Sequence, residues 1–84
     1  MPVLSRFYGI IIRMYFQQAE HNPPHIHALY GDDMAEVDIK TGEIIEGSLP
    51  PRALAMVREW IEINKKELLY MWKTQEFRKL APLE

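Results

Sequence analysis

Residues 25–39 read HIHALYGDDMAEVDI and predict a β-hairpin with one apolar face. With Asp32-Asp33 as the turn after Gly31, the apolar residues form three cross-strand pairs: Tyr30 with Ala35, Ala28 with Val37, and Ile26 with Ile39. The opposite face then holds His25, His27, Leu29, Glu36 and Asp38, with His27 directly across from Asp38. A one-residue slip would bury these polar groups, so the cost of burying them supports the predicted faces.

Strands are also predicted on both sides of this hairpin. Phe7–Phe16 is rich in aromatic and β-branched residues, which predicts a long central strand covered on both faces. Gln17–Pro24 is polar and ends in two prolines that cannot donate ladder hydrogen bonds, so it is predicted as a loop. After a turn at Lys40–Gly42, residues 43–46 predict a further strand. A bulged three-residue loop before this strand would turn Ile45 inward, and a tight two-residue loop would turn Ile44 inward. The sequence leaves both open.

The second half of the chain predicts helix. Pro50-Pro51 suits a helix N-terminus, and an apolar face follows at helical spacing, formed by Ala53, Leu54, Val57, Trp60 and Ile61. Asn64 and Glu67 resemble a capping arrangement, which predicts a kink or break before a second helical segment with Leu68, Leu69 and Trp72. Residues 78–84 are expected to form a poorly ordered tail.

Together these elements predict one small α+β domain over residues 1–84. Strands over about residues 3–47 form an antiparallel sheet of three to four strands, and one or two C-terminal helices over about residues 51–76 pack on one face of it. A chain of 84 residues buries only about 60–65% of its surface on folding, which leaves no room for a deep cofactor cavity. We therefore expect no cofactor.

The charge distribution restricts the classes of partner. The net charge of -2 and the pI of about 5.9 argue against a free-standing nucleic-acid binder. The charge is uneven, because residues 1–51 carry three basic and seven acidic groups, whereas residues 52–84 carry seven basic and five acidic groups. A modest basic patch is therefore expected on the helical half. Its Lys65, Lys66 and Lys73, and separately His21 in the first half, could contact RNA or an acidic partner. An ordinary solvated helix face explains the lysines equally well.

The chain contains no cysteine. A disulfide scaffold, a thiolate zinc site and a thiol nucleophile are therefore excluded. No apolar run approaches the length of about 18 residues that a membrane span needs, and the first residues do not resemble a secretory signal. We expect a cytoplasmic protein with no membrane partner.

The histidines are the one concentrated chemical signal, since all three lie between His21 and His27. His25 and His27 stand two residues apart on a predicted strand, so they share a face, and Asp38 on the next strand could fix a ring tautomer. In this hypothesis the pair transfers protons during metal-independent cleavage of RNA, with the ribose 2′-hydroxyl as nucleophile. An arginine, either Arg6 or Arg13, would offset the phosphate charge.

Two other interpretations of the histidines stay open. In a metal site, His25 and His27 would be joined by either His21 or Asp38, with one coordination position open. The spacing allows this site but does not require it, so no metal is predicted. Alternatively, the histidines form an exposed face beside a proline-stiffened loop, with a cross-strand contact worth a few tenths of a kcal/mol.

The sequence also resembles a known family. Arg6–Ile10, Arg13–Tyr15 and Pro23–Ala28 together resemble the bacterial domain of unknown function 4160 family. The similarity continues through Thr41–Glu43, Gly47–Pro50, Trp60 and Leu68-Leu69 to Trp72. No catalytic residue of this family is established, and its members usually carry a polar residue where this chain has Leu29.

The resemblance implies a compact bacterial protein often encoded beside a second small protein, as in toxin–antitoxin pairs. The expected function is the toxin-like component, acting as an endoribonuclease, with RNA and an antitoxin-like protein as partners. The alternative is a non-enzymatic regulatory module that binds protein or RNA, and a metal-dependent hydrolase is a third hypothesis. A second copy of the chain also stays open as a partner.

Overall fold

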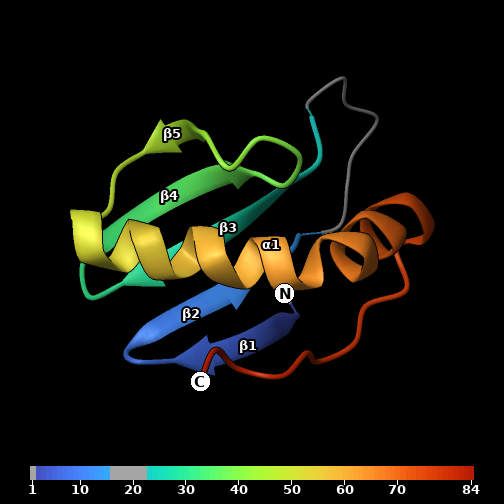
Figure 1. Ribbon diagram of the computed structural model, residues 1–84. Helices are drawn as coiled ribbons and strands as arrows, with labels where there is room; N and C mark the ends of the chain where they lie inside the picture. Colours follow the sequence, from blue (N-terminus) through green and yellow to red (C-terminus); the bar gives the residue numbers. More distant parts are fainter. Residues whose placement is uncertain (1, 16–22) are drawn as a thin grey trace.

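A computed structural model describes residues 2–15 and 23–84, which form an antiparallel sheet and one long helix (Figure 1). The strands are β1 (Val3–Phe7), β2 (Ile10–Arg13), β3 (His25–Tyr30), β4 (Asp33–Asp38) and β5 (Ile44–Gly47), and the helix is α1 (Pro51–Thr74). The sheet follows chain order, β1-β2-β3-β4-β5, with every neighbouring pair antiparallel. The predicted α+β class is confirmed, but the sheet has five strands instead of three to four.

The predicted long strand over Phe7–Phe16 is wrong, because it contains a turn. Tyr8 and Gly9 both have positive φ angles, 50° and 82°, and Phe7 pairs with Ile10 across them. This two-residue turn with positive φ at both positions matches the twist of paired strands and joins β1 to β2. The central strand of the sheet is therefore β3.

The register of the β3–β4 hairpin also differs from the prediction. Tyr30 pairs with Asp33, so Gly31-Asp32 forms the turn, with Gly31 at a φ of 60° in the position where a type II′ turn requires glycine. His27 consequently lies across from Glu36 instead of Asp38. The shift of two residues preserves the predicted faces, and the pattern of buried residues in both strands confirms them.

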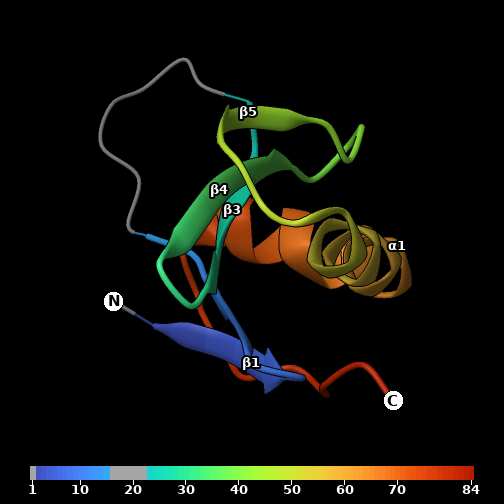
Figure 2. The ribbon, with the colours of Figure 1, turned by 90° about the vertical axis from the view of Figure 1, so that its left-hand side faces the viewer.

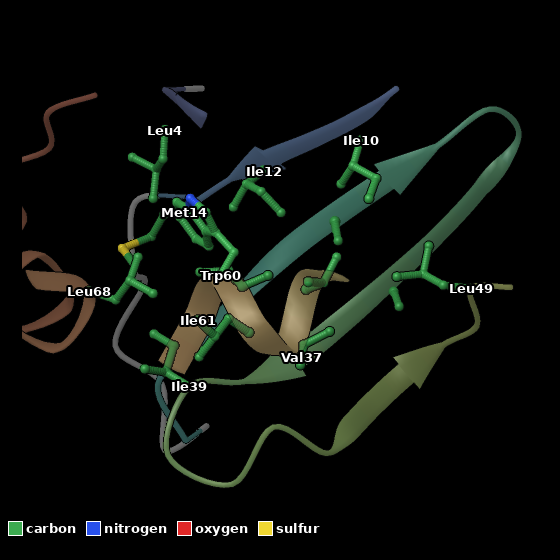
Figure 3. Close-up of a cluster of buried hydrophobic side chains, with 14 of the residues drawn as sticks. Leu4, Ile10, Ile12, Met14, Val37, Ile39, Leu49, Trp60, Ile61 and Leu68 are labelled. Carbon is green, nitrogen blue, oxygen red and sulfur yellow. The ribbon is translucent and has the colours of Figure 1, made fainter. Parts of the chain in front are cut away.

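The apolar face of the sheet packs against α1, which lies along one side of it (Figure 2). The helix begins at Pro51, as predicted, and its buried residues include Val57, Trp60 and Ile61. Figure 3 shows Trp60 and Ile61 gathered with side chains of the sheet, among them Ile12 and Val37. Sheet residues in this core are Leu4, Phe7, Ile10, Ile12, Ile26, Ala28, Ala35 and Val37. Half-buried Ile44 packs on the core and Ile45 is exposed, which settles the facing of β5.

The predicted kink at Asn64 is confirmed. Asn64 has non-helical angles of φ -108° and ψ 15°, and its side-chain amide donates a hydrogen bond to the Trp60 carbonyl. The bend lets the last turns of α1 reach the start of β3, where Trp72 packs on His25.

The residues after α1 return along β1 (Figure 1). The Leu80 amide donates a hydrogen bond to the Leu4 carbonyl, and the Trp60 indole N–H donates to the Ala81 carbonyl at 2.9 Å. The composition of this tail did not predict such packing. Within residues 2–15 and 23–84, no helix combines the length and the apolar character that crossing a membrane requires.

Candidate functional site

The face of the sheet that points away from the first half of α1 carries a row of polar side chains. Directly paired residues on neighbouring strands share a face. Arg13 pairs with His27, His27 pairs with Glu36, and Glu36 pairs with Glu46. Four adjacent strands therefore place a guanidinium, an imidazole and two carboxylates side by side.

Three of the polar side chains on this face converge, and we call His25, His27 and Glu36 the His-His-Glu cluster. His25 Nε2 lies 3.6 Å from Glu36 Oε1, and His27 Nε2 lies 3.5 Å from Glu36 Oε2. One possible ligand atom from each residue lies within 4.8 Å of the other two. The cluster can therefore hold a metal ion, and it can also place two imidazoles and a carboxylate around one ligand.

His25 is held from two sides. Its Nδ1 lies 2.9 Å from the Pro23 carbonyl oxygen, and since a carbonyl can only accept, Nδ1 donates this hydrogen bond. Its ring also packs against Trp72, with ring centroids 5.0 Å apart, and the side chain is only 11% exposed. These contacts leave Nε2 as the atom that faces Glu36.

His27 is packed equally closely. The Tyr15 ring meets it edge to face at a centroid distance of 4.2 Å, and the side chain is 13% exposed. Burial lowers the pKa of His27 below its ordinary value, and the Glu36 carboxylate partly opposes that shift. Its Nδ1 is buried without a hydrogen-bond partner among the described residues.

Asp38, predicted as the partner of His27, has a different role. One of its carboxylate oxygens accepts hydrogen bonds from the backbone amides of Lys40 and Thr41, at 2.7 and 3.1 Å. Asp38 therefore holds the turn that follows β4. Glu36 replaces it in the site, a role that the predicted register missed.

The other predicted site residues lie partly on the sheet and partly on α1. Arg6 and Arg13 lie on the same face as the His-His-Glu cluster, on β1 and β2, and Arg13 Nε is buried without a hydrogen bond among the described residues. Lys65 lies on α1, where its ammonium group contacts the Lys40 carbonyl and Glu62. Lys66 and Lys73 are exposed on the same helix, and His21 lies outside the described residues.

The sequence was compared with models of known protein families. A family model described as Domain of unknown function (DUF4160) matches residues 9–73. The chain belongs to the DUF4160 family. The matched region of this DUF4160 domain contains the whole His-His-Glu cluster, Arg13 and Trp72, whereas Arg6 lies before it. No curated protein and no solved structure matches the chain.

Proposed function

We propose that this DUF4160 domain cleaves phosphodiester bonds of RNA and acts as the toxin-like component of a toxin–antitoxin pair. The observation that carries the proposal is the row in which Arg13, His27 and Glu36 lie side by side on β2, β3 and β4. Cleavage of a phosphodiester needs a cation at the phosphate and, next to it, groups that assist the attacking and leaving oxygens. The row supplies both within three adjacent strands.

On this face of the sheet, basic side chains lie at the β1–β2 side and acidic side chains lie at the β4–β5 side. Arg6 and Arg13 lie on β1 and β2, whereas Glu36, Asp38 and Glu46 lie on β4 and β5. A phosphate would therefore bind over β2, where a guanidinium can donate to two of its oxygens. RNA supplies its own nucleophile, the 2′-hydroxyl, so a shallow face without a deep cavity is sufficient for this reaction.

A second candidate is a regulatory module that binds a partner without catalysis. Tyr8 lies in the β1–β2 turn and is 61% exposed, and Tyr30 and Met34 flank the β3–β4 turn and are 38% and 40% exposed. Tyr30 packs near Gly9, so both turns lie at the same end of the sheet. Exposed large apolar side chains at this end of the sheet favour contact with a partner protein.

Growth of a bacterial host after induced expression separates the two candidates. The wild-type chain is expected to arrest growth, and His25→Ala and His27→Ala are expected to abolish the arrest because each removes one imidazole of the site. Glu59→Ala, an exposed change on α1, is the control and is expected to arrest growth like the wild type. Soluble yields are matched before the comparison.

Two results would contradict the proposal. Arrest by both histidine variants at equal soluble yield would keep a toxin but remove the His-His-Glu cluster from its mechanism. No arrest by well-folded wild-type protein would contradict the toxin role and favour the regulatory module.

A further inference from the structure

We propose that His25, His27 and Glu36 bind a divalent metal ion of the zinc type and leave one coordination position open. Two imidazoles and one carboxylate, with a fourth position for water or substrate, form a donor set of catalytic zinc sites. The sequence alone predicted no metal, and it offered only His21 or Asp38 as a third ligand. Glu36 changes that conclusion because it reaches both histidines.

The distances within the cluster suit metal ligands better than hydrogen-bonded partners. An N–H···O hydrogen bond is about 2.7–3.2 Å long, whereas both Nε2–carboxylate distances here are longer, at 3.5 and 3.6 Å. Around a tetrahedral zinc ion with bonds of about 2.0–2.1 Å, neighbouring ligand atoms lie about 3.3–3.4 Å apart. The two imidazole–carboxylate distances are close to that spacing, although they end at different oxygens of Glu36, and one ligand atom from each of the three residues lies within 4.8 Å of the other two. Binding the ion therefore needs these atoms to move closer by at most about 1.5 Å.

The hydrogen bond of His25 adds an independent indication. A histidine that binds a metal ion usually donates its other ring N–H to a carboxylate, a backbone carbonyl or water, which fixes the tautomer and the ring orientation. His25 donates from Nδ1 to the Pro23 carbonyl in this way. The lone pair of its neutral ring is therefore on Nε2, the atom that faces Glu36.

The surrounding charge also favours a cation. Besides Glu36, the same face carries Asp38 across from His25 and Glu46 across from Glu36. The cluster is partly buried, with Glu36 only 22% exposed, so its carboxylate is screened by water less than a surface group would be. A divalent ion at this position would offset that negative charge.

The ion would also serve the proposed function. Without it, a phosphate over the row would meet the Glu36 carboxylate, and like charges repel. A bound divalent ion would reverse the sign of the charge there and offer its open position to a phosphate oxygen. In that state the two imidazoles hold the ion, and polarisation of the phosphate by the ion takes the place of proton transfer by the histidines. This role in cleavage rests on the proposed function, whereas metal binding itself rests only on the geometry of the cluster.

Isothermal titration of zinc chloride into the full chain, after treatment with a chelator and dialysis, tests the site. The wild type is expected to bind one equivalent of zinc. His25→Ala, His27→Ala and Glu36→Gln each remove a ligand and are expected to weaken binding about 100-fold or more, beyond the range typical of losing a second-shell partner. Glu59→Gln makes the same change at an exposed carboxylate on α1, away from the cluster, and is expected to leave zinc affinity within about twofold of the wild type.

Circular dichroism and urea unfolding of each variant show whether it is folded, and Glu36→Gln preserves side-chain shape if an alanine variant is not. The absence of stoichiometric zinc binding by the wild type, or unchanged affinity in all three folded cluster variants, would overturn the metal site. RNA cleavage is measured separately, with and without chelator. Zinc binding lost in the cluster variants of a protein that cleaves no RNA would support the metal site while contradicting the proposed function.

Discussion

The Trp60→Ala variant is expected to lose about 3–5 kcal/mol of unfolding free energy. Trp60 is fully buried between the sheet and the returning tail, with its ring centroid 5.9 Å from that of Phe7. Its replacement leaves a cavity and removes the indole donor from the Ala81 carbonyl. Since small domains are stable by only about 5–15 kcal/mol, urea unfolding followed by circular dichroism should show a much lower midpoint.

Ile63→Ala is the matched control for this prediction. Ile63 lies three residues further along α1 and is 68% exposed, so its replacement should change the unfolding free energy by no more than about 0.5 kcal/mol. If Trp60→Ala cost less than about 1 kcal/mol, or no more than Ile63→Ala, the packing of α1 against the sheet would be described wrongly.

Gly47→Ala is expected to destabilise the domain by about 2–5 kcal/mol, for two reasons that add. Gly47 ends β5 with a φ of 82°, where a residue with a side chain is strained. A Cβ at this position would also collide with the Met34 carbonyl oxygen and lie 3.0 Å from the Ala35 Cα, both parts of the β4 backbone. Because these atoms belong to the sheet, relief of the collision requires the β4–β5 pairing to shift.

Gly31→Ala measures the backbone strain without the steric collision. Gly31 has a φ of 60°, but a Cβ there would meet no atom within 4 Å. Its replacement therefore carries the backbone strain alone, about 1–2 kcal/mol. A cost at Gly31 equal to or greater than the cost at Gly47, measured by urea unfolding of both variants, would contradict the steric account of β5.

Hydrophobic alternation predicted the faces of the sheet but not its registers. Ile26, Ala28, Ala35 and Val37 share the core face both in the predicted hairpin and in the structure. A shift of two residues leaves every side chain on the same face, so the pattern cannot distinguish the two registers. The turn at Gly31 decides between them, and a correct assignment of that turn would have predicted the right pairing.

The sequence pattern also did not reveal the turn between β1 and β2 or the role of Glu36 in the site. Tyr8-Gly9 is a turn inside an apolar run, and the aromatic and β-branched composition hid it. The clustering of His25 and His27 was visible in the sequence. Glu36 was predicted on their face, but its partnership with them depends on register. Trp72 reaches His25 only through the kinked helix, which is a tertiary contact that no local pattern contains.

The central claim is that His25, His27 and Glu36 act as one site, and cleavage of RNA by the purified chain tests it most directly. Wild type and Glu59→Gln, which changes an exposed carboxylate on α1, are expected to cleave at similar rates. His25→Ala, His27→Ala and Glu36→Gln should each be slower by about 100-fold or more. A double variant should be little slower than the single variants, because members of one catalytic unit do not contribute additively. Wild-type rates in the three folded cluster variants would contradict the account.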